Sequence, residues 1–311
     1  MTNGDIGERL VDSLHAAYGR HAGHRAAHAK GVLCAAAFTP TDDAAGLTTA
    51  AHLQAGAGPV RAHVRFSNGG GNPSLPDTQR DARGMAVKWY LPDGTTTDLV
   101  ALSLPVFFAR TPEDLLEFNA ARRPDPATGA PDTAKVVAYL EEHPEAGAAV
   151  MAAMGHVIPA SYAALTYYGL HTFWFVDATG ARHAIRYTLR PAVDESALGD
   201  DEAAAAPADY LTTELTQRLV AGPVVFTLEA TLGEAGDPID DPTAQWPADR
   251  ATVRLGELTI TGIATDRERD GDVLVFDPTR VTPGIECSND PILHARSDAY
   301  RVSVARRTQT G

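Results

Sequence analysis

The sequence predicts an α+β fold: an antiparallel, eight-stranded β-barrel core with flanking helices. About eight segments carry the apolar patterns of strands in hairpin-like order, while the helical segments are grouped in the middle and at the ends of the chain. The chain has 311 residues. That is long for an average domain but suits a barrel, because barrels of roughly 200–250 residues often form one domain. We therefore expect a single domain over residues 1–311, with an N-terminal helix and short arm at 1–24 and the core at 25–307. Such a barrel can hold one ligand in or beside its sheet.

One helix and four strands are expected in the first third of the chain. Residues 4–20 place apolar side chains four positions apart, which predicts an amphipathic helix, and the apolar run 32–38 predicts a strand. Segment 60–67 alternates strictly, with Arg, His and Ser side chains on its polar face. It therefore predicts a half-buried strand whose polar face lines a pocket or meets water. Strands at 84–91 and 96–103 follow, joined by the turn Pro92-Asp93-Gly94.

The rest of the chain divides into a helical middle, further strands and a closing helix. Thr111-Pro112 and Asp290-Pro291 each place a capping residue before a proline, which is typical of helix starts, and we expect the closing helix to end near Arg301. The Ala-rich, acidic residues 196–208 form a surface segment. Helices are expected at 112–122, 133–142, 144–154 and 211–219, strands at 170–176, 183–189, 224–232 and 253–263, and a short apolar run at 273–276.

Composition and charge exclude several classes of partner. The hydrophobic fraction of 44% is ample for a core, and the formal net charge of −14 disfavours nucleic acid and anionic membrane surfaces. No run approaches the roughly 18 apolar residues of a membrane span, and residues 1–5 do not resemble an export signal. We therefore expect a cytoplasmic protein that contacts no membrane, with Cys34 and Cys287 as free thiols.

Two short motifs are ambiguous from the residues alone. Gly69-Gly70-Gly71 is interpreted as a flexible turn, because no Gly-Lys-Ser/Thr follows it as in a phosphate-binding loop. His21, His24 and His28 share helical spacing and could suggest zinc, but no carboxylate or cysteine completes the site nearby and Gly23 disfavours a rigid helix.

His28 and Tyr300 are the candidates for chemistry. His28 lies at a helix-to-strand junction, and an imidazole that titrates near neutrality suits proton transfer or ligation, although a solvated loop histidine is the simpler interpretation. Arg296 and Tyr300 are four residues apart and share a helix face. A fixed cation there favours the phenolate, a known axial ligand of haem iron, whereas the alternative is an ordinary packing pair.

Several segments taken in order resemble the haem catalase superfamily. They extend over nearly the whole chain, from about residue 25 to 307. The chain is much shorter than a typical catalase, so it looks like the minimal branch, the catalase-related peroxidases. The segments are Arg25–Gly31, Val64–Ser67, Thr78–Lys88, Pro105–Phe108, His171–Phe173, Asp241–Pro247, Pro283–Ile285 and Arg296–Tyr300.

The resemblance implies haem b as cofactor and a role for each matching residue. His28 would be the acid–base residue on the distal side of the haem, with Ser67 bonded to its other ring nitrogen. Tyr300 would ligate ferric iron as a tyrosinate held by Arg296. The remaining implied haem contacts are Arg25, Arg65 and Arg307 to the propionates and Ala27, His171 and Phe276 in the haem pocket.

Departures from the family pattern point to a peroxidase. Leu102 stands where catalases carry the distal asparagine, Leu115 where a phenylalanine usually covers the haem, and Ala27 where a valine usually narrows access. The resemblance therefore implies reduction of hydrogen peroxide or organic hydroperoxides through an oxo-ferryl intermediate, with a small-molecule reductant and weak catalase activity. Two alternatives remain open: a hydroperoxide-rearranging enzyme like allene oxide synthase, and a haem-binding or peroxide-sensing protein without turnover. We also expect a homo-oligomer, either a dimer or a tetramer.

Overall fold

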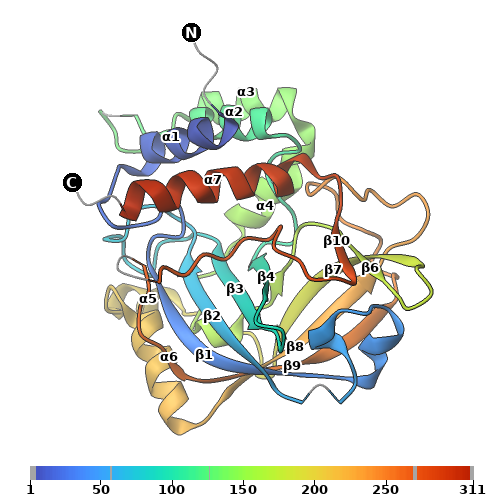
Figure 1. The fold of residues 1–311 in the computed structure, drawn as a ribbon. Helices are drawn as coiled ribbons and strands as arrows, with labels where there is room; N and C mark the ends of the chain where they lie inside the picture. The colour runs from blue at the N-terminus through green and yellow to red at the C-terminus, as the bar shows by residue number, and fades with distance from the viewer. Residues whose placement is uncertain (1–4, 57, 126, 269–271, 309–311) are drawn as a thin grey trace.

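The core is a closed ring of eight antiparallel strands, seen in a computed structural model that describes residues 5–308 apart from 57, 126 and 269–271. The first four residues of the predicted arm therefore lie outside the described residues. The ring closes because β7 pairs with β5 on one side and with β8 on the other, which confirms the predicted barrel (Figure 1). Its strands are β1 (Gly31–Pro40), β2 (Val60–Asn68), β3 (Arg83–Tyr90), β4 (Thr96–Leu102), β5 (Tyr167–Tyr168), β7 (Arg182–Pro191), β8 (Val224–Leu232) and β9 (Thr252–Ile263).

Two short strands extend the sheet beyond the ring. Strand β6 (Phe173–Val176) pairs with β7, and β10 (Ile285–Cys287) pairs with β6. The sequence predicted the start of β6 three residues too early, at 170, and its end correctly. It did not predict β5 or β10, because two or three residues are too few to show a period of two. The apolar run 273–276 is not a strand.

Strand β2 shows how the alternating pattern separates the core from the site. Its apolar face packs in the barrel interior, where Phe66 is fully buried and its ring stacks on that of Tyr162 with centroids 5.5 Å apart. The opposite face carries Arg65 and Ser67, which are also buried although they point away from this core. The predicted polar face therefore lines a pocket near the end of the strand.

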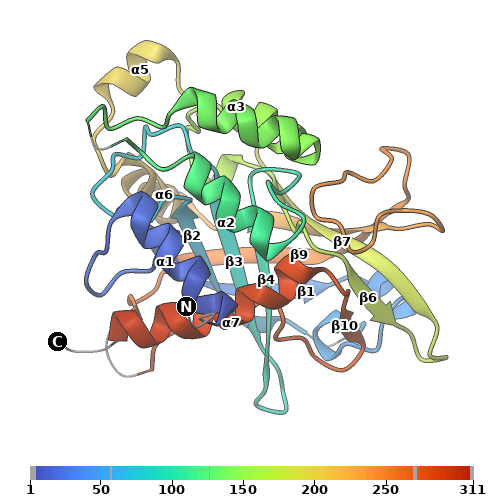
Figure 2. The same cartoon turned by 90° about the horizontal axis from the view of Figure 1, so that it is seen from above.

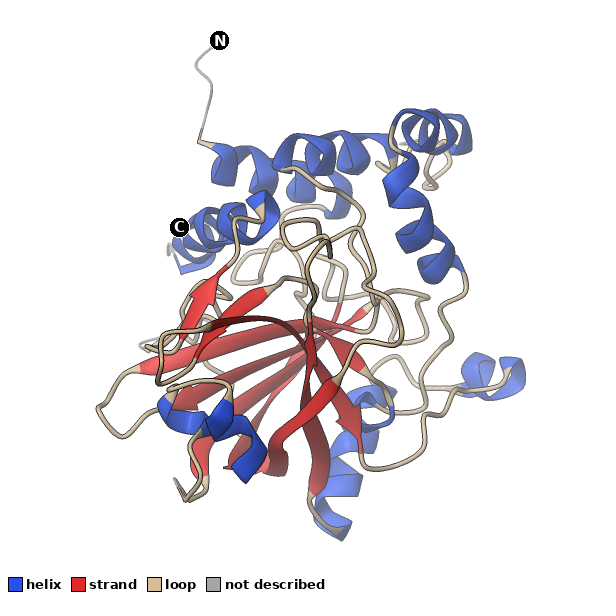
Figure 3. Cartoon of the chain, turned by 90° about the vertical axis from the view of Figure 1, so that its right-hand side faces the viewer, coloured by secondary structure: helices blue, strands red, loops and turns tan. Residues whose placement is uncertain are grey.

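Helices cover one side of the barrel. Helices α1, α2, α3 and α7 lie together there (Figures 1 and 2), and Figure 3 shows most of the helical segments gathered over the strands. The helices are α1 (Ile6–Tyr18), α2 (Pro112–Ala121), α3 (Thr133–Glu142), α4 (Gly147–Met154), α5 (Asp200–Ala205), α6 (Tyr210–Ala221) and α7 (Pro291–Thr308), with 3₁₀ turns at Asp42–Gly46, Ala51–Leu53, Pro144–Ala146 and Tyr162–Ala164.

Helix α7 is longer than predicted. It begins as expected, because the Asp290 carboxylate accepts hydrogen bonds from the backbone N–H groups of Ile292 and Leu293. It continues to Thr308 instead of ending near Arg301, so Arg307 lies two turns beyond Tyr300 on the same helix face. Helix α1 packs closely on α7: a Cβ added at Gly7 would lie 2.7 Å from the backbone of Asp298.

The two cysteines are free thiols, as predicted. Cys34 is fully buried in the barrel, and burial raises the pKa of its thiol to about 12. No helix in the described part of the chain is both long enough and apolar enough to cross a bilayer.

Candidate functional site

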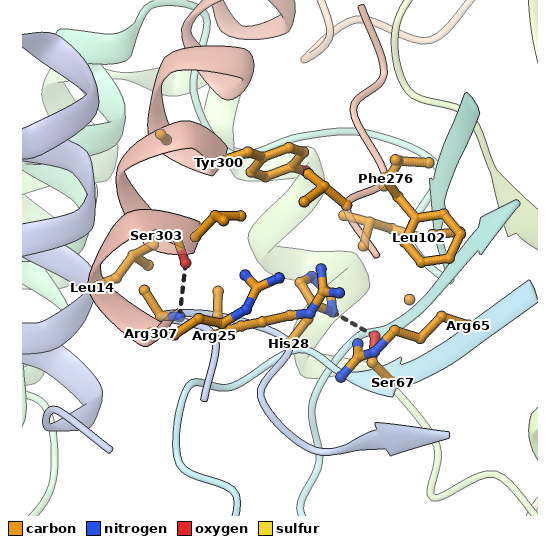
Figure 4. A pocket seen from close by; sticks show the side chains of 18 of the residues that line it. Leu14, Arg25, His28, Arg65, Ser67, Leu102, Phe276, Tyr300, Ser303 and Arg307 are labelled. Atoms are coloured by element: carbon orange, nitrogen blue, oxygen red, sulfur yellow. Dashed lines mark hydrogen bonds between the residues drawn. The ribbon is translucent and has the colours of Figure 1, made fainter. Parts of the chain in front are cut away.

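A cavity lies between the outer face of β2, β3 and β4 and the inner face of α7. Most of its wall is apolar and comes from α1, β3, β4 and α7, including Leu14, Val100, Leu102 and Val304. The cavity brings together most of the predicted site residues (Figure 4): Arg25, Ala27, His28, Arg65, Ser67, Phe276, Tyr300 and Arg307. A mostly apolar pocket with a few polar groups that converge on it is typical of a cofactor site.

His28 is held on one side of this cavity in a strained conformation. Its φ of 55° is the only positive value at a non-glycine residue within the described ranges, and such residues cluster at functional sites. Its Nδ1 lies 3.0 Å from Ser67 Oγ. Burial, followed by the nearby charges of Arg65, Arg296 and Arg25, lowers the pKa of His28 to about 3, so the imidazole is neutral at physiological pH.

Glycines hold His28 in place. The backbone N–H groups of His28 and Ala29 donate to the carbonyls of Gly69 and Gly70, at 3.0 and 3.1 Å. The N–H of Gly70 donates in turn to Asp81 Oδ2 at 2.6 Å. The glycine segment 69–71, predicted to be a flexible turn, is therefore fixed by hydrogen bonds to the His28 segment and to Asp81.

Gly84 on β3 faces the same histidine. A Cβ at this position would lie 2.8 Å from both His28 Nδ1 and Ser67 Oγ, closer than van der Waals contact allows. The imidazole therefore occupies space that only glycine leaves open.

Tyr300 lies on the opposite side of the cavity, at the end of a chain of polar contacts. Arg296 donates to Tyr300 Oη from Nε at 3.0 Å and from Nη2 at 2.6 Å, and its Nη1 donates to His171 Nε2 at 2.8 Å. His171 Nδ1 lies 2.6 Å from Asp290 Oδ2. Burial lowers the pKa of His171, so the ring is neutral; with Nε2 accepting, Nδ1–H donates to Asp290.

His171 and Arg296 do not line the cavity. The sequence placed His171 in the haem pocket, whereas the structure places it behind Tyr300, where it contacts Arg296. Asp290 was recognised only as a helix cap, because its contact with a residue 119 positions away leaves no local signal.

Three arginines converge at one edge of the cavity. Arg25 Nε and Arg65 Nε each lie 2.8 Å from the Glu268 carboxylate, and Arg307 Nε lies 3.7 Å from it. Burial and the neighbouring cation Arg25 lower the pKa values of Arg65 and Arg307 to about 10. Although burial raises the pKa of Glu268, the charges of Arg65, Arg25 and Arg307 bring it below its usual value, so this carboxylate is ionised. Glu268 was not predicted, since it lies outside every segment of the resemblance.

Comparisons with known proteins decide the family. The family model for catalase matches residues 8–310. The chain belongs to the catalase family. It is 40% identical over 309 residues to a catalase-related peroxidase of Mycolicibacterium paratuberculosis, an alignment that covers 99% of this chain and 96% of that protein. It is 35% identical to a catalase-related peroxidase of Synechococcus elongatus, covering 97% and 88%.

A solved catalase shares the fold. A crystal structure of a fungal catalase superposes with a TM-score of 0.82 at 26% identity, over 93% of this chain and 60% of the fungal chain. This match confirms the predicted barrel. The family model and the two related peroxidases confirm the predicted enzyme class, a catalase-related peroxidase, and catalase-family membership implies haem.

Of the three positions that depart from the family pattern, the structure places two in the lining of this catalase-family site. Leu102 and Ala27 line the cavity, as expected, whereas Leu115 on α2 does not. The structure also gives no helical face to the zinc arrangement that the sequence disfavoured, because α1 ends at Tyr18 before His21 and the His28 ring turns toward Ser67.

Proposed function

We propose that the chain binds haem b in this cavity and reduces hydrogen peroxide or an organic hydroperoxide, taking electrons from a small-molecule reductant. Tyr300 would ligate ferric iron, and His28 would be the acid–base residue. The observation that carries the proposal is the placement of Tyr300, paired with Arg296, across one cavity from a neutral His28 paired with Ser67.

The residues present fit this cofactor. The apolar wall suits the faces of a porphyrin, and the arginine cluster at one edge suits its carboxylates. Arg307 Nη2 is buried without a hydrogen-bond partner among the described residues, which leaves a donor for an incoming carboxylate. When bound, haem iron supplies the Lewis-acid and redox chemistry that breaks the O–O bond.

His28 would move the proton. A neutral imidazole whose Nδ1–H donates to Ser67 Oγ would leave Nε2 free to accept a proton from one peroxide oxygen and to return it to the other, which leaves as water or alcohol. Such proton transfer by a positioned side chain commonly contributes about 10²–10⁴ in rate. The backbone contacts with Gly69 and Gly70, together with the hold of Asp81 on Gly70, would keep the residue in place.

The Tyr300 side would hold negative charge on the ligand oxygen. Two guanidinium N–H groups donate to Tyr300 Oη, where they would stabilise negative charge, and Asp290 orients Arg296 through His171.

Leu102 would favour peroxidase over catalase turnover. Its apolar side chain lines the cavity on the His28 side and offers no donor to orient a second hydrogen peroxide. Ala27, which stands where a valine usually narrows access, also lines the cavity and would leave room for bulkier hydroperoxides.

Spectra and kinetics of the purified protein test the proposal. We expect a Soret band with haemin, hydroperoxide reduced to the corresponding alcohol with oxidation of a reductant such as guaiacol, and slow oxygen evolution. The variant His28→Gln should keep the Soret band and lose about 10²-fold or more in its rate with peroxide. An unchanged rate would remove His28 from the mechanism, and rearranged ketone or epoxide products would favour the allene oxide synthase-like alternative.

A further inference from the structure

Glu268 contacts the three arginines that the proposed function assigns to the haem carboxylates, although it is not itself among the residues that line the cavity. Arg25 Nε donates to both Glu268 oxygens, at 3.0 and 2.8 Å, and Arg65 Nε lies 2.8 Å from one of them. Arg307 Nε donates to the backbone carbonyl of Glu268 at 3.2 Å. The side chain of Glu268 is only 15% exposed, so solvent screens these contacts weakly.

Without this carboxylate the arginines would repel one another. The guanidinium groups are largely buried, with side-chain exposures of 16%, 7% and 3% for Arg25, Arg65 and Arg307. Arg25 lowers the pKa values of both neighbours, after burial itself, which is the effect expected of like charges held close together. Glu268 therefore stabilises the cluster when no other anion is present.

The charge of the cluster still leaves room for the two propionates of haem b. Three guanidinium charges against one carboxylate leave a net charge of +2, which two propionates would neutralise. Arg307 also interacts with Asp266, but that side chain is exposed and solvent screens it. The buried Arg307 Nη2, which has no partner in the described part of the chain, offers a donor that Glu268 does not use.

We propose that Glu268 is a third carboxylate ligand of the propionate site. It holds Arg25, Arg65 and Arg307 together without haem and shares them with the propionates when haem binds. Because the same donors then serve three carboxylates, each Glu268 contact contributes less to stability with haem bound than without it. This inference rests on the proposed function, since it assigns the cluster to propionates.

The consequence is an opposite effect of one substitution on two measurements. Replacing Glu268 by an uncharged residue should lower the stability of the haem-free protein. It should also tighten haem binding. The substitution destabilises the haem-free protein more than the haem complex, and this difference makes binding more favourable. A residue with a merely structural role would weaken haem binding or leave it unchanged.

Titration of the haem-free full chain with haemin tests this inference, using the variant Glu268→Gln, the charge-retaining variant Glu268→Asp and thermal unfolding of each protein. We expect Glu268→Gln to unfold at a lower temperature without haem and to bind haemin about tenfold more tightly, whereas Glu268→Asp stays within about threefold of the parent chain. The tighter binding should be absent with haemin dimethyl ester, which carries no carboxylate. The matched control is Glu229→Gln. Glu229 lies on β8 outside the cavity lining and pairs with Arg190, so its substitution should change neither the unfolding temperature nor the haemin affinity.

The outcomes separate the two claims. Haemin affinity that is unchanged or weaker in Glu268→Gln, or a gain that persists with the dimethyl ester, would overturn the role of Glu268 while leaving the proposed function intact. A parent chain that forms no Soret band with haemin would overturn the proposed function and this inference with it.

Discussion

The variant Gly84→Ala should damage the proposed acid–base pair without damaging the fold. Gly84 lies in β3, where its partner on β2 is Ser67. A Cβ there would be 2.8 Å from both His28 Nδ1 and Ser67 Oγ. Ordinary contact requires roughly 3.5 Å, so the imidazole and the hydroxyl must each move by about 0.7 Å. The φ of Gly84 is not positive, so the methyl group strains no backbone, and alanine in a strand is favoured over glycine by about 0.5–1 kcal/mol.

A displacement of this size acts on the reaction rate. A misplacement of about 1 Å can cost roughly 10²-fold, so we expect the rate with hydrogen peroxide to fall by about that factor while the Soret band after haemin titration is unchanged. Stopped-flow mixing with peroxide measures the rate. The matched control is Gly147→Ala on α4, where an added Cβ meets nothing within 4 Å, and it should react like the parent chain. A rate for Gly84→Ala within threefold of the parent would refute the claim that His28 acts from the observed position.

Two further substitutions test the His28-side wall and the barrel core. Leu102→Asn adds an amide donor to the cavity and should raise oxygen evolution relative to reductant oxidation by up to about tenfold, the effect of one hydrogen bond, whereas Leu102→Ala should not. His52 packs against the rings of Phe38 and Trp89, its Nδ1 is buried with no hydrogen-bond partner among the described atoms, and burial lowers its pKa to about 3. As the pH falls, His52 binds a proton in the unfolded chain before it does so in the folded protein. The contribution of the neutral His52 to the unfolding free energy is therefore fully present above pH 6.5 and is lost as the pH falls toward 3. His52→Leu should therefore reduce the loss in unfolding free energy between pH 7.5 and pH 5 by about 2 kcal/mol in urea titrations; an unchanged loss would contradict a neutral buried His52.

Periodicity predicted those parts of the fold that are long enough to show it. Strand β2 and helix α1 repeat their patterns over two or more periods, and both were predicted close to their observed bounds. Strand β5, with two residues, closes the ring but carries no pattern of its own. The end of α7 was predicted too early because its last turns are rich in Arg, Ser and Thr and show no apolar stripe.

The candidate site also contains residues that the sequence could identify and residues that it could not. Residues within the family-like segments, such as His28, Ser67 and Tyr300, could be named from the sequence, and the structure brings them to one cavity. Asp290 and Glu268 could not, because each meets its partners only through the tertiary fold. Gly84 was part of a quoted segment, but its reason for being glycine is the position of an imidazole on another element.

The resonance Raman spectrum of the haemin-loaded protein tests the central claim most directly, because it reports which group ligates the iron. We predict phenolate ring vibrations in the parent chain and their loss in Tyr300→Phe, with Tyr168→Phe, a half-buried tyrosine outside the cavity lining, as the matched control. Phenolate vibrations that persist in Tyr300→Phe, or that are absent from the parent chain, would contradict the assignment of Tyr300 as the axial ligand.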